Sequence, residues 1–294
     1  MHGWIILDKP LGLGSTQAVA AAKRNLRSAG FGKVKVGHGG TLDPLATGVL
    51  PIALGEATKL CGRMLDASKT YDFTISFGTE TSGLDAEGDI VSTSDHRPTL
   101  EDVQAVLAQF TGPIEQVPPA YSAIKIDGKR AYDLARAGEF VCMKSRSITV
   151  HNLNLRHAEL VSASIVQPRQ DSIDAEWTMK QVQGDERLSV VTLSAHVSKG
   201  TYIRSLARDI AYAVGTVGHV SMLRRHSGAG EKFTEAQMDW LRMIRDHIAT
   251  SIHITRDDLD FAPFDAQGGL GQMYALFGSG MDAVLDEINE ALSA

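Results

Sequence analysis

Residues 37–59 (GHGGTLDPLATGVLPIALGEATK) place one carboxylate, Asp43, between a glycine-rich turn and a proline. No arrangement of Cys or Ser nucleophiles, no metal-binding cluster and no nucleotide-binding loop surrounds Asp43 in the sequence. A carboxylate presented in this way is suited to nucleophilic or acid–base chemistry that requires no cofactor. An Asp-Pro pair is also a common opening of a type I turn, because Asp bonds to nearby backbone and Pro fixes φ. The dipeptide alone therefore leaves both interpretations open.

Several further motifs, taken in order along the chain, resemble one protein family. Residues 37–59 resemble the second signature of the TruB family of tRNA pseudouridine synthases. Residues 7–16 (LDKPLGLGST) resemble its first signature, although Gly14 stands where a small polar residue is more usual. The other matching blocks, which bring the resemblance to roughly residues 4–230, are Lys69-Thr70-Tyr71, 77–91 (FGTETSGLDAEGDIV), 117–139 (VPPAYSAIKIDGKRAYDLARAGE), 197–210 (VSKGTYIRSLARDI) and 217–230 (VGHVSMLRRHSGAG).

The resemblance implies a cofactor-free isomerisation of uridine 55 in the T loop of tRNA. In that reaction the N1–C1′ bond breaks, the uracil rotates and C5 joins C1′. Asp43 would be the nucleophile, attacking either C1′ of the ribose or C6 of the uracil. Arg204, in GTYIR, matches the family's Arg that pairs with the catalytic Asp, and such a pair favours the ionised carboxylate and fixes its rotamer. Taken alone, Arg204 is more typical of a structural surface ion pair of small energetic effect.

The resemblance also implies roles for two aromatic rings when the target base is flipped out of the RNA. Enzymes that act on one base usually extrude it from the helix stack. His38 matches the residue that fills the vacated place in the RNA, and its flanking glycines allow close approach of the backbone. Tyr71 matches the Tyr that stacks on the flipped base and is the candidate for removing the C5 proton. Without the resemblance, His38 is typical of an exposed loop and Tyr71 of a buried strand aromatic.

Four more residues match positions around the family's cleft. Tyr202 and Leu223 match residues that line the uracil pocket, although Leu223 is also compatible with an ordinary core position. Lys9 and Lys59 match lysines near the cleft, and we expect them to position phosphates or loops. The resemblance therefore assigns substrate contacts to all four.

Residues 122–150 correspond to the family's clamp on the RNA stem-loop and carry an excess of basic residues. We expect Lys125, Lys129, Arg130 and Arg146 to contact the RNA backbone. A charge run of this kind is also typical of a solvated surface. The cations of the segment are Lys125, Lys129, Arg130, Arg136, Lys144 and Arg146, against Asp127, Asp133 and Glu139.

The net charge of −6 is unevenly distributed, which is compatible with RNA binding. Residues 227–294 hold 4 Lys/Arg and 12 Asp/Glu, a net of −8, whereas residues 1–226 hold 25 and 23, a net of +2. Residues 1–71 hold 9 and 4, a net of +5. Phosphate binding depends on the local patch and not on the total charge, so the family-like part keeps a basic surface.

The patterns of apolar residues predict an α+β protein. Strands and helices alternate without a regular βαβ order, which favours a mixed, largely antiparallel sheet. The resemblance implies the pseudouridine synthase fold, with a central sheet and flanking helices and loops around an RNA-binding cleft. The predicted strands are 4–7, 48–54, 71–77, 147–155 and 188–197. One helix is predicted after a cap at Thr16, and two more over 100–110 and 206–214. A turn is predicted at 85–88.

Two segments depart from the family and set the expected domain boundaries. Residues 158–186 are polar and irregular, which indicates a surface insertion. Residues 231–294 form a divergent acidic region without a recognisable PUA domain, so we assign 1–230 to the catalytic domain. Within the acidic region we expect helices from 234 to about 247 and over 281–292, with a glycine-rich loop at 268–280 between them.

Composition limits the classes of protein to which the chain can belong. The content of 43% hydrophobic and 22% charged residues is ordinary for a soluble protein, and no apolar run approaches 18 residues. Cys61 and Cys142 are too few for a zinc site alone and are not spaced as a redox pair, and no secretory signal opens the chain. We therefore expect a cytoplasmic monomer that needs no cofactor, metal or partner protein and binds the T stem-loop of tRNA. The alternatives are a pseudouridine synthase acting on another RNA and a non-catalytic protein that binds RNA or helps tRNA to fold.

Overall fold

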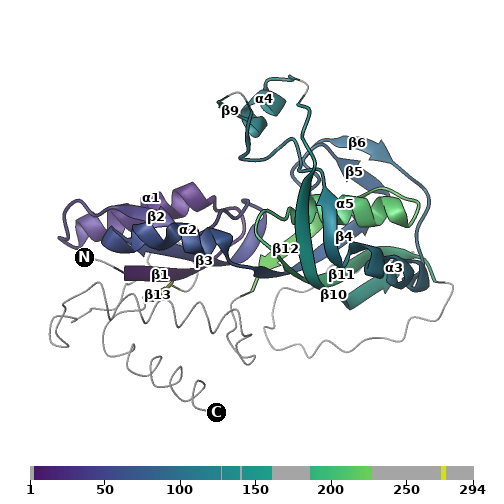
Figure 1. Cartoon of the computed structure of the whole chain (residues 1–294), viewed down its shortest axis with the longest axis horizontal. Helices are drawn as coiled ribbons and strands as arrows, with labels where there is room; N and C mark the ends of the chain where they lie inside the picture. Colours follow the sequence, from purple (N-terminus) through teal and green to yellow (C-terminus); the bar gives the residue numbers. More distant parts are fainter. Residues whose placement is uncertain (1–2, 127, 140, 161–185, 227–272, 276–294) are drawn as a thin grey trace, which may run out of the picture. The chain divides into compact units, whose positions relative to one another are not determined.

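The computed structural model describes residues 3–126, 128–139, 141–160, 186–226 and 273–275 (Figure 1). The chain divides into two compact units, one formed by Met1–Ser68 with Arg224–Ala294 and the other by Lys69–Leu223. The helices at 234–247 and 281–292 and residues 161–185 of the expected insertion lie outside the described residues. No helix within the described ranges has the length and apolarity needed to cross a membrane.

The first unit is built on a small antiparallel sheet. Strand β1 (Gly3–Lys9) pairs with β3 (Ala46–Leu54), which also pairs with β2 (Val36–His38). The described part of the unit also contains helix α1 (Ser15–Ser28), the 3₁₀ helix η1 (Gly55–Leu60) and helix α2 (Cys61–Asp66), and α1 and α2 lie over one face of its strands (Figure 1). The 3₁₀ helix η1 and helix α2 are held against β1 and β3 by an apolar cluster of Trp4, Ala53, Ala57, Leu60 and Met64.

Helix α1 begins two residues earlier than a cap at Thr16 would place it. Gly14 is the N-cap, and its N–H donates to Gln17 Oε1 at 2.8 Å. The hydroxyl of Ser15 is directed elsewhere, since it accepts from Leu42 N at 2.8 Å and donates to Leu42 O at 2.9 Å. The expected Thr16 cap is therefore wrong, because the serine before it ties the helix start to the loop that precedes Asp43.

The second unit contains a sheet in the order β12-β4-β11-β10-β7. Phe73, Ile75 and Leu193 are fully buried on this sheet, and α5 adds Leu206 and Ile210 to the same core. The strands are β4 (Lys69–Phe77), β7 (Gly112–Gln116), β10 (Arg146–Leu160), β11 (Leu188–Val197) and β12 (Gly218–Arg225), whose last two residues belong to the first unit. Helices α3 (Leu100–Leu107), α4 (Ala131–Arg136) and α5 (Ile203–Ala213), the 3₁₀ helix η2 (Ala108–Phe110) and the hairpins β5 (Thr79–Thr81)–β6 (Ile90–Thr93) and β8 (Lys125–Ile126)–β9 (Lys129–Arg130) complete the described elements.

The structure confirms the α+β class and the mixed, largely antiparallel sheet. β11 pairs antiparallel with β4 and with β10, and β10 pairs antiparallel with β7. The alternation over 71–77 marks a strand whose Phe73, Ile75 and Phe77 are buried, as expected. Helix α3 begins with a capping box in which Thr99 Oγ1 accepts from Asp102 N and Asp102 Oδ2 accepts from Thr99 N.

Three boundaries differ from the sequence-based expectations. β10 continues past Leu155 to Leu160, because register shifts at 150/152 and 155/157 interrupt the alternation that marks a strand in the sequence. Residues 158–160, expected in the insertion, therefore belong to this strand. Met273–Ala275, expected in a loop, forms β13, which pairs with β1 at Ile5–Leu7. Helix α5 begins at Ile203 and not at Leu206, since Tyr202 O accepts from Leu206 N and closes its first turn.

Candidate active site

Asp43 lies half-buried in the loop between β2 and β3 of the first unit. Its carbonyl accepts from Ala46 N at 3.0 Å, so the Asp-Pro pair does open a turn. Lys9 is fully buried beside this turn, and its ammonium donates to Pro10 O at 3.0 Å, Leu13 O at 2.7 Å and Pro44 O at 3.2 Å. All three of these bonds go to backbone carbonyls, of residues 10 and 13 on one side and of Pro44 on the other. Of the two roles expected for Lys9, loop positioning fits this geometry.

The other side of the Asp43 loop is bound by Arg225, which the sequence analysis did not single out. Its buried guanidinium donates to Val49 O at 2.8 Å, Gly40 O at 3.2 Å and Thr41 O at 3.5 Å. At Gly48, with φ of +97°, a Cβ would lie 2.0 Å from Arg225 O. The glycine is therefore required by close backbone approach as well as by its left-handed conformation.

His38 and Lys59 lie in the same unit in different environments. His38 is half-buried on β2, and its Nδ1 accepts from Gly40 N at 3.4 Å. Burial, and secondarily the charge of Arg225, lowers the pKa of His38, so its imidazole is neutral at neutral pH. Lys59 is exposed on η1 and forms an ion pair with Glu56.

The lowered pKa of His38 predicts a pH effect on stability. Because folding disfavours the protonated ring, the unfolded chain binds more protons as the pH falls through the ordinary His value of 6.5. The stabilisation is complete above that pH and is lost as the pH falls toward the lower folded-state pKa. In urea titrations at about pH 7 and pH 5, His38→Gln should lose less unfolding free energy than the wild type, and exposed His96→Gln should match the wild type. Identical losses in His38→Gln and wild type would contradict this.

Arg204 is the central side chain of the second unit's site. It lies on α5 with 8% of its side chain exposed, and it donates to Asp85 Oδ2 at 3.1 Å, Gly83 O at 2.8 Å and Tyr121 O at 3.0 Å. Leu84, between the two acceptors of the turn, has φ of +59°, a strained conformation for a residue with a Cβ. Arg204 thus forms a buried ion pair with Asp85, and the pairing expected with Asp43 remains a prediction.

Tyr71 and Leu223 lie on strands of the second unit. Tyr71 is opposite Ala195 in the β4–β11 pair, and it is half-buried at the end of the row that contains Phe73. Leu223 is buried on β12. Without the family resemblance, Tyr71 is typical of a buried strand aromatic. In the structure it does lie on a strand, but it is only partly buried.

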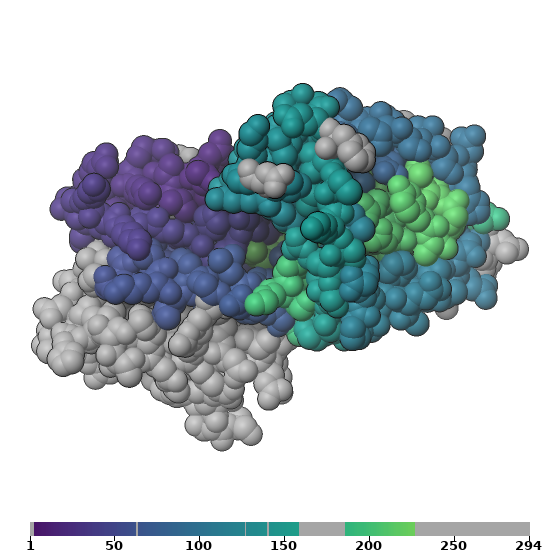
Figure 2. All heavy atoms as spheres, turned by 45° about the horizontal axis from the view of Figure 1, so that its top comes forward, coloured from purple at the N-terminus to yellow at the C-terminus, as the bar shows by residue number. Residues whose placement is uncertain are grey.

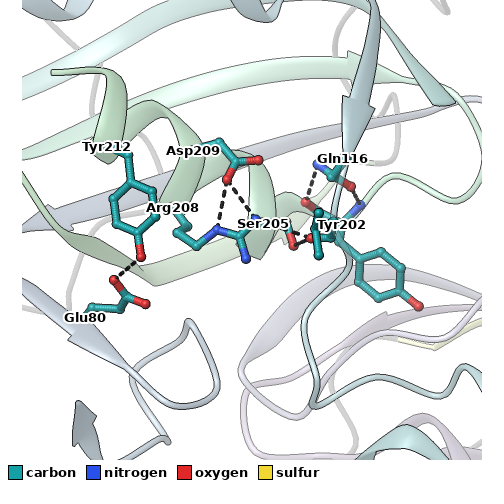
Figure 3. A network of polar contacts seen from close by, with 8 residues as sticks. Glu80, Gln116, Tyr202, Ser205, Arg208, Asp209 and Tyr212 are labelled. Carbon is teal, nitrogen blue, oxygen red and sulfur yellow. Dashed lines mark hydrogen bonds and ion pairs between the residues drawn. The ribbon is translucent and has the colours of Figure 1, made fainter. Parts of the chain in front are cut away.

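Tyr202 is fixed through its backbone at the N-cap of α5. The buried amide of Gln116 accepts from Tyr202 N at 2.8 Å and donates to Tyr202 O at 3.2 Å (Figure 3). Figure 3 shows the Tyr202 ring directed away from this amide. The guanidinium carbon of Arg146 lies 5.6 Å from the ring centroid, so the structure brings a predicted backbone contact and a predicted pocket residue together.

The other three predicted backbone contacts lie on one exposed hairpin. Lys125 on β8 is opposite Arg130 on β9, and Lys129 is adjacent, with all three side chains exposed. The guanidinium carbon of Arg130 lies 5.9 Å from the ring centroid of Tyr132, the second residue of the neighbouring helix α4. Among the described residues, no group of three or more His, Cys, Asp or Glu side chains could hold a metal ion.

Comparison with known proteins assigns the chain to a family. The family model described as TruB family pseudouridylate synthase (N terminal domain) matches residues 27–203. The chain belongs to the TruB family. A second model, described as EcoEI R protein C-terminal, matches residues 191–293, about a third of the chain, and overlaps the first match at 191–203.

Relatives of this TruB family member are similar over most of its length. It is 66% identical over 226 residues to tRNA pseudouridine synthase B of Novosphingobium aromaticivorans, which covers 76% of this chain and 66% of that protein. It is 56% identical over 225 residues to the protein of the same name from Zymomonas mobilis, covering 76% and 65%. The chain thus spans about two thirds of the length of these relatives.

A solved structure supports the pseudouridine synthase fold. The chain is 28% identical to a chain in the crystal structure of a Cbf5-Nop10-Gar1 complex, with a TM-score of 0.50. The match covers 80% of this chain and 51% of that chain. The α+β fold that carries Tyr71 on a strand and Arg204 on a helix therefore has a counterpart among known structures.

Helix α5 of this TruB family member also anchors the segment that contributes Tyr121. Ser205 Oγ donates to Val117 O at 2.8 Å, and Arg208 binds Asp209 at 2.7 Å (Figure 3). Farther along the helix, Tyr212 donates to Glu80 at 2.6 Å, and burial followed by this bond raises the pKa of Tyr212 to about 12. The bonds to Val117 O and Glu80 fix α5 at two points that follow Arg204 in the helix.

Asp85 and Arg225 are the supporting residues that sequence reasoning missed. Both lie inside blocks that resemble the family, 77–91 and 217–230, so the signal was present at the level of the block. What the blocks did not indicate is that Asp85 would pair with Arg204 or that Arg225 would bind the Asp43 loop. Such roles depend on contacts between segments far apart in the sequence.

Proposed function

We propose that this TruB family member isomerises uridine to pseudouridine at position 55 in the T loop of tRNA, with Asp43 as nucleophile and without a cofactor. The proposal is supported by the family match and by relatives named tRNA pseudouridine synthase B. The observation that carries it is the Asp43 loop, where two buried cations, Lys9 and Arg225, hold the backbone on both sides of a half-buried carboxylate. A fixed, accessible carboxylate is suited to nucleophilic attack.

In the proposed reaction, the Asp43 carboxylate attacks C1′ of the ribose or C6 of the uracil. The N1–C1′ bond breaks, the base rotates and the C5–C1′ bond forms, and the bond between Asp43 and the substrate breaks to regenerate the carboxylate. The C5 proton is removed by Tyr71, and N1 gains a proton, so that no atom is added or lost overall. Arg204 favours the ionised carboxylate, and neutral His38 occupies the place of the flipped base.

The remaining contacts are assigned to RNA binding. Tyr202 and Leu223 line the uracil pocket, and Lys59 lies near the cleft. The exposed cations of the β8–β9 hairpin, Lys125, Lys129 and Arg130, with Arg146, bind phosphates of the T stem-loop. Residues 1–230 form the catalytic domain of a cytoplasmic monomer that needs no protein partner, and residues 231–294 are a divergent acidic region outside the site.

The experiment that tests the function is tritium release from C5-labelled uridine in an unmodified tRNA transcript. Release is expected from the wild type and should vanish when the target uridine is changed to cytidine. No release from a folded protein that binds the transcript would overturn the assignment to tRNA position 55. Ribosomal RNA would then be the next substrate.

Tyr71→Phe is expected to keep RNA binding but lower turnover. The phenyl ring still stacks on the base, whereas the hydroxyl that accepts the C5 proton is gone, and general-base catalysis typically contributes about 10²- to 10⁴-fold. Single-turnover tritium release should fall in that range, with the Kd for RNA within about twofold of the wild type. Tyr212→Phe, which removes a hydroxyl bonded to Glu80, should retain wild-type turnover. Wild-type turnover in Tyr71→Phe would remove Tyr71 as the base.

A further inference from the structure

One described segment of the first unit has only cations among its Lys, Arg, Asp and Glu side chains. Residues 9–42 contain six Lys or Arg and no Asp or Glu. Lys9 is buried, and the other five are exposed. We call the five exposed cations the α1 surface: Lys23, Arg24, Arg27, Lys33 and Lys35.

Helix α1 carries most of its buried residues and its charged residues on opposite sides. Its buried residues include Ala18, Ala22 and Leu26, which pack toward the strands of the unit. At 100° per residue, Lys23, Arg24 and Arg27 lie on the opposite side of the helix. Figure 2 shows this N-terminal part of the chain, in purple, at the surface of the unit.

The end of α1 turns the chain so that an aromatic ring and two more cations follow the helix. Phe31 N donates to Leu26 O and Gly30 N to Arg27 O, both at 3.1 Å, and Gly30 has φ of +85°. This is the Schellman pattern of a helix C-terminus. Phe31 is 46% exposed, and Lys33 and Lys35 come directly after it.

The charges of this surface are not balanced within the described part of the protein. None of the five cations forms a salt bridge there. Lys23 and Arg27 are four residues apart, a spacing at which like charges destabilise a helix by a few tenths of a kcal/mol. The helix dipole favours a cation in the last turn, which accounts for Arg27 alone. An external anion would offset the remaining repulsion.

We infer that the α1 surface binds the phosphate backbone of the substrate RNA, a contact separate from the β8–β9 hairpin. The inference rests on the proposed function, which supplies a polyanionic substrate. Exposed arginines with an exposed aromatic ring suit phosphates and an unpaired base. A membrane surface fits poorly, because an interfacial helix needs a free apolar face and that of α1 is buried.

The test is the salt dependence of RNA binding by a charge-neutral triple variant, Lys23→Gln with Arg24→Gln and Arg27→Gln. The Kd for the unmodified tRNA transcript at about 0.1 M salt should rise at least about tenfold, and the slope of log K against log salt should become shallower by about 2 to 3. A charge-retaining triple, Lys23→Arg with Arg24→Lys and Arg27→Lys, should bind like the wild type. Exposed Arg187→Gln in the second unit should also leave Kd unchanged.

Each outcome decides the inference separately from the proposed function. An unchanged Kd and slope in a folded triple variant would overturn it even if tritium release is normal. Displacement of RNA by polyglutamate as efficiently as by unlabelled transcript would overturn the assignment to RNA in favour of an acidic protein. Conversely, wild-type protein that binds the transcript through these cations without releasing tritium would refute the proposed reaction and leave the RNA surface standing.

Discussion

Asp43→Asn is expected to abolish tritium release from C5-labelled tRNA while leaving RNA binding within about twofold of the wild type. Loss of a nucleophile commonly lowers turnover by roughly 10⁴-fold or more. Asn has nearly the shape of Asp, but its amide cannot act as the carboxylate nucleophile. The measurement is single-turnover release beside a filter-binding titration with the same transcript.

The structure explains why Asp43→Asn should remain folded. The loop is held by bonds from Lys9 to Pro44 O and from Arg225 to Gly40 O and Val49 O, which are backbone acceptors that the substitution leaves in place. Exposed Asp95→Asn provides a matched control and should keep full turnover. Substantial release by Asp43→Asn would rule out this residue as the nucleophile.

Arg204→Ala is expected to lower the free energy of unfolding by about 3 to 5 kcal/mol, as for other buried ion pairs that lose one partner. The change leaves the Asp85 carboxylate, 12% exposed, without its guanidinium and removes the donor from Gly83 O and Tyr121 O. Urea unfolding monitored by circular dichroism gives the free energy, independently of whether the protein modifies RNA.

A second arginine in the same protein provides the comparison. Arg224 forms a bidentate pair with Asp8 in which the side chains are 41% and 42% exposed, so Arg224→Ala should cost no more than about 1 kcal/mol. In a double-mutant cycle, Asp85→Asn should reduce the additional cost of Arg204→Ala, because no buried charge is then left unpaired. Equal losses for Arg204→Ala and Arg224→Ala would show that burial of the Asp85 pair contributes little.

The sequence predicted correctly those elements that are specified by residues close together in the chain. The alternation over 71–77 requires a strand with one buried face, and Thr99 with Asp102 forms the expected capping box. Such local patterns failed where an irregular residue interrupts the alternation of a strand, or where a contact with a distant residue sets the end of a helix. The register shifts in β10 hide its continuation to Leu160, and Ser15 bonds to Leu42, which moves the helix start away from Thr16.

The sequence by itself determined the family, the α+β class and the identity of the candidate residues, since Asp43, Tyr71 and Arg204 all lie in recognisable blocks. Only the tertiary structure decided what holds them. Arg225 binds Val49 O across 176 residues, and Arg204 binds Asp85 across 119. A buried guanidinium must find acceptors wherever folding brings them, so its partners are fixed by the packing of distant segments and not by neighbouring residues.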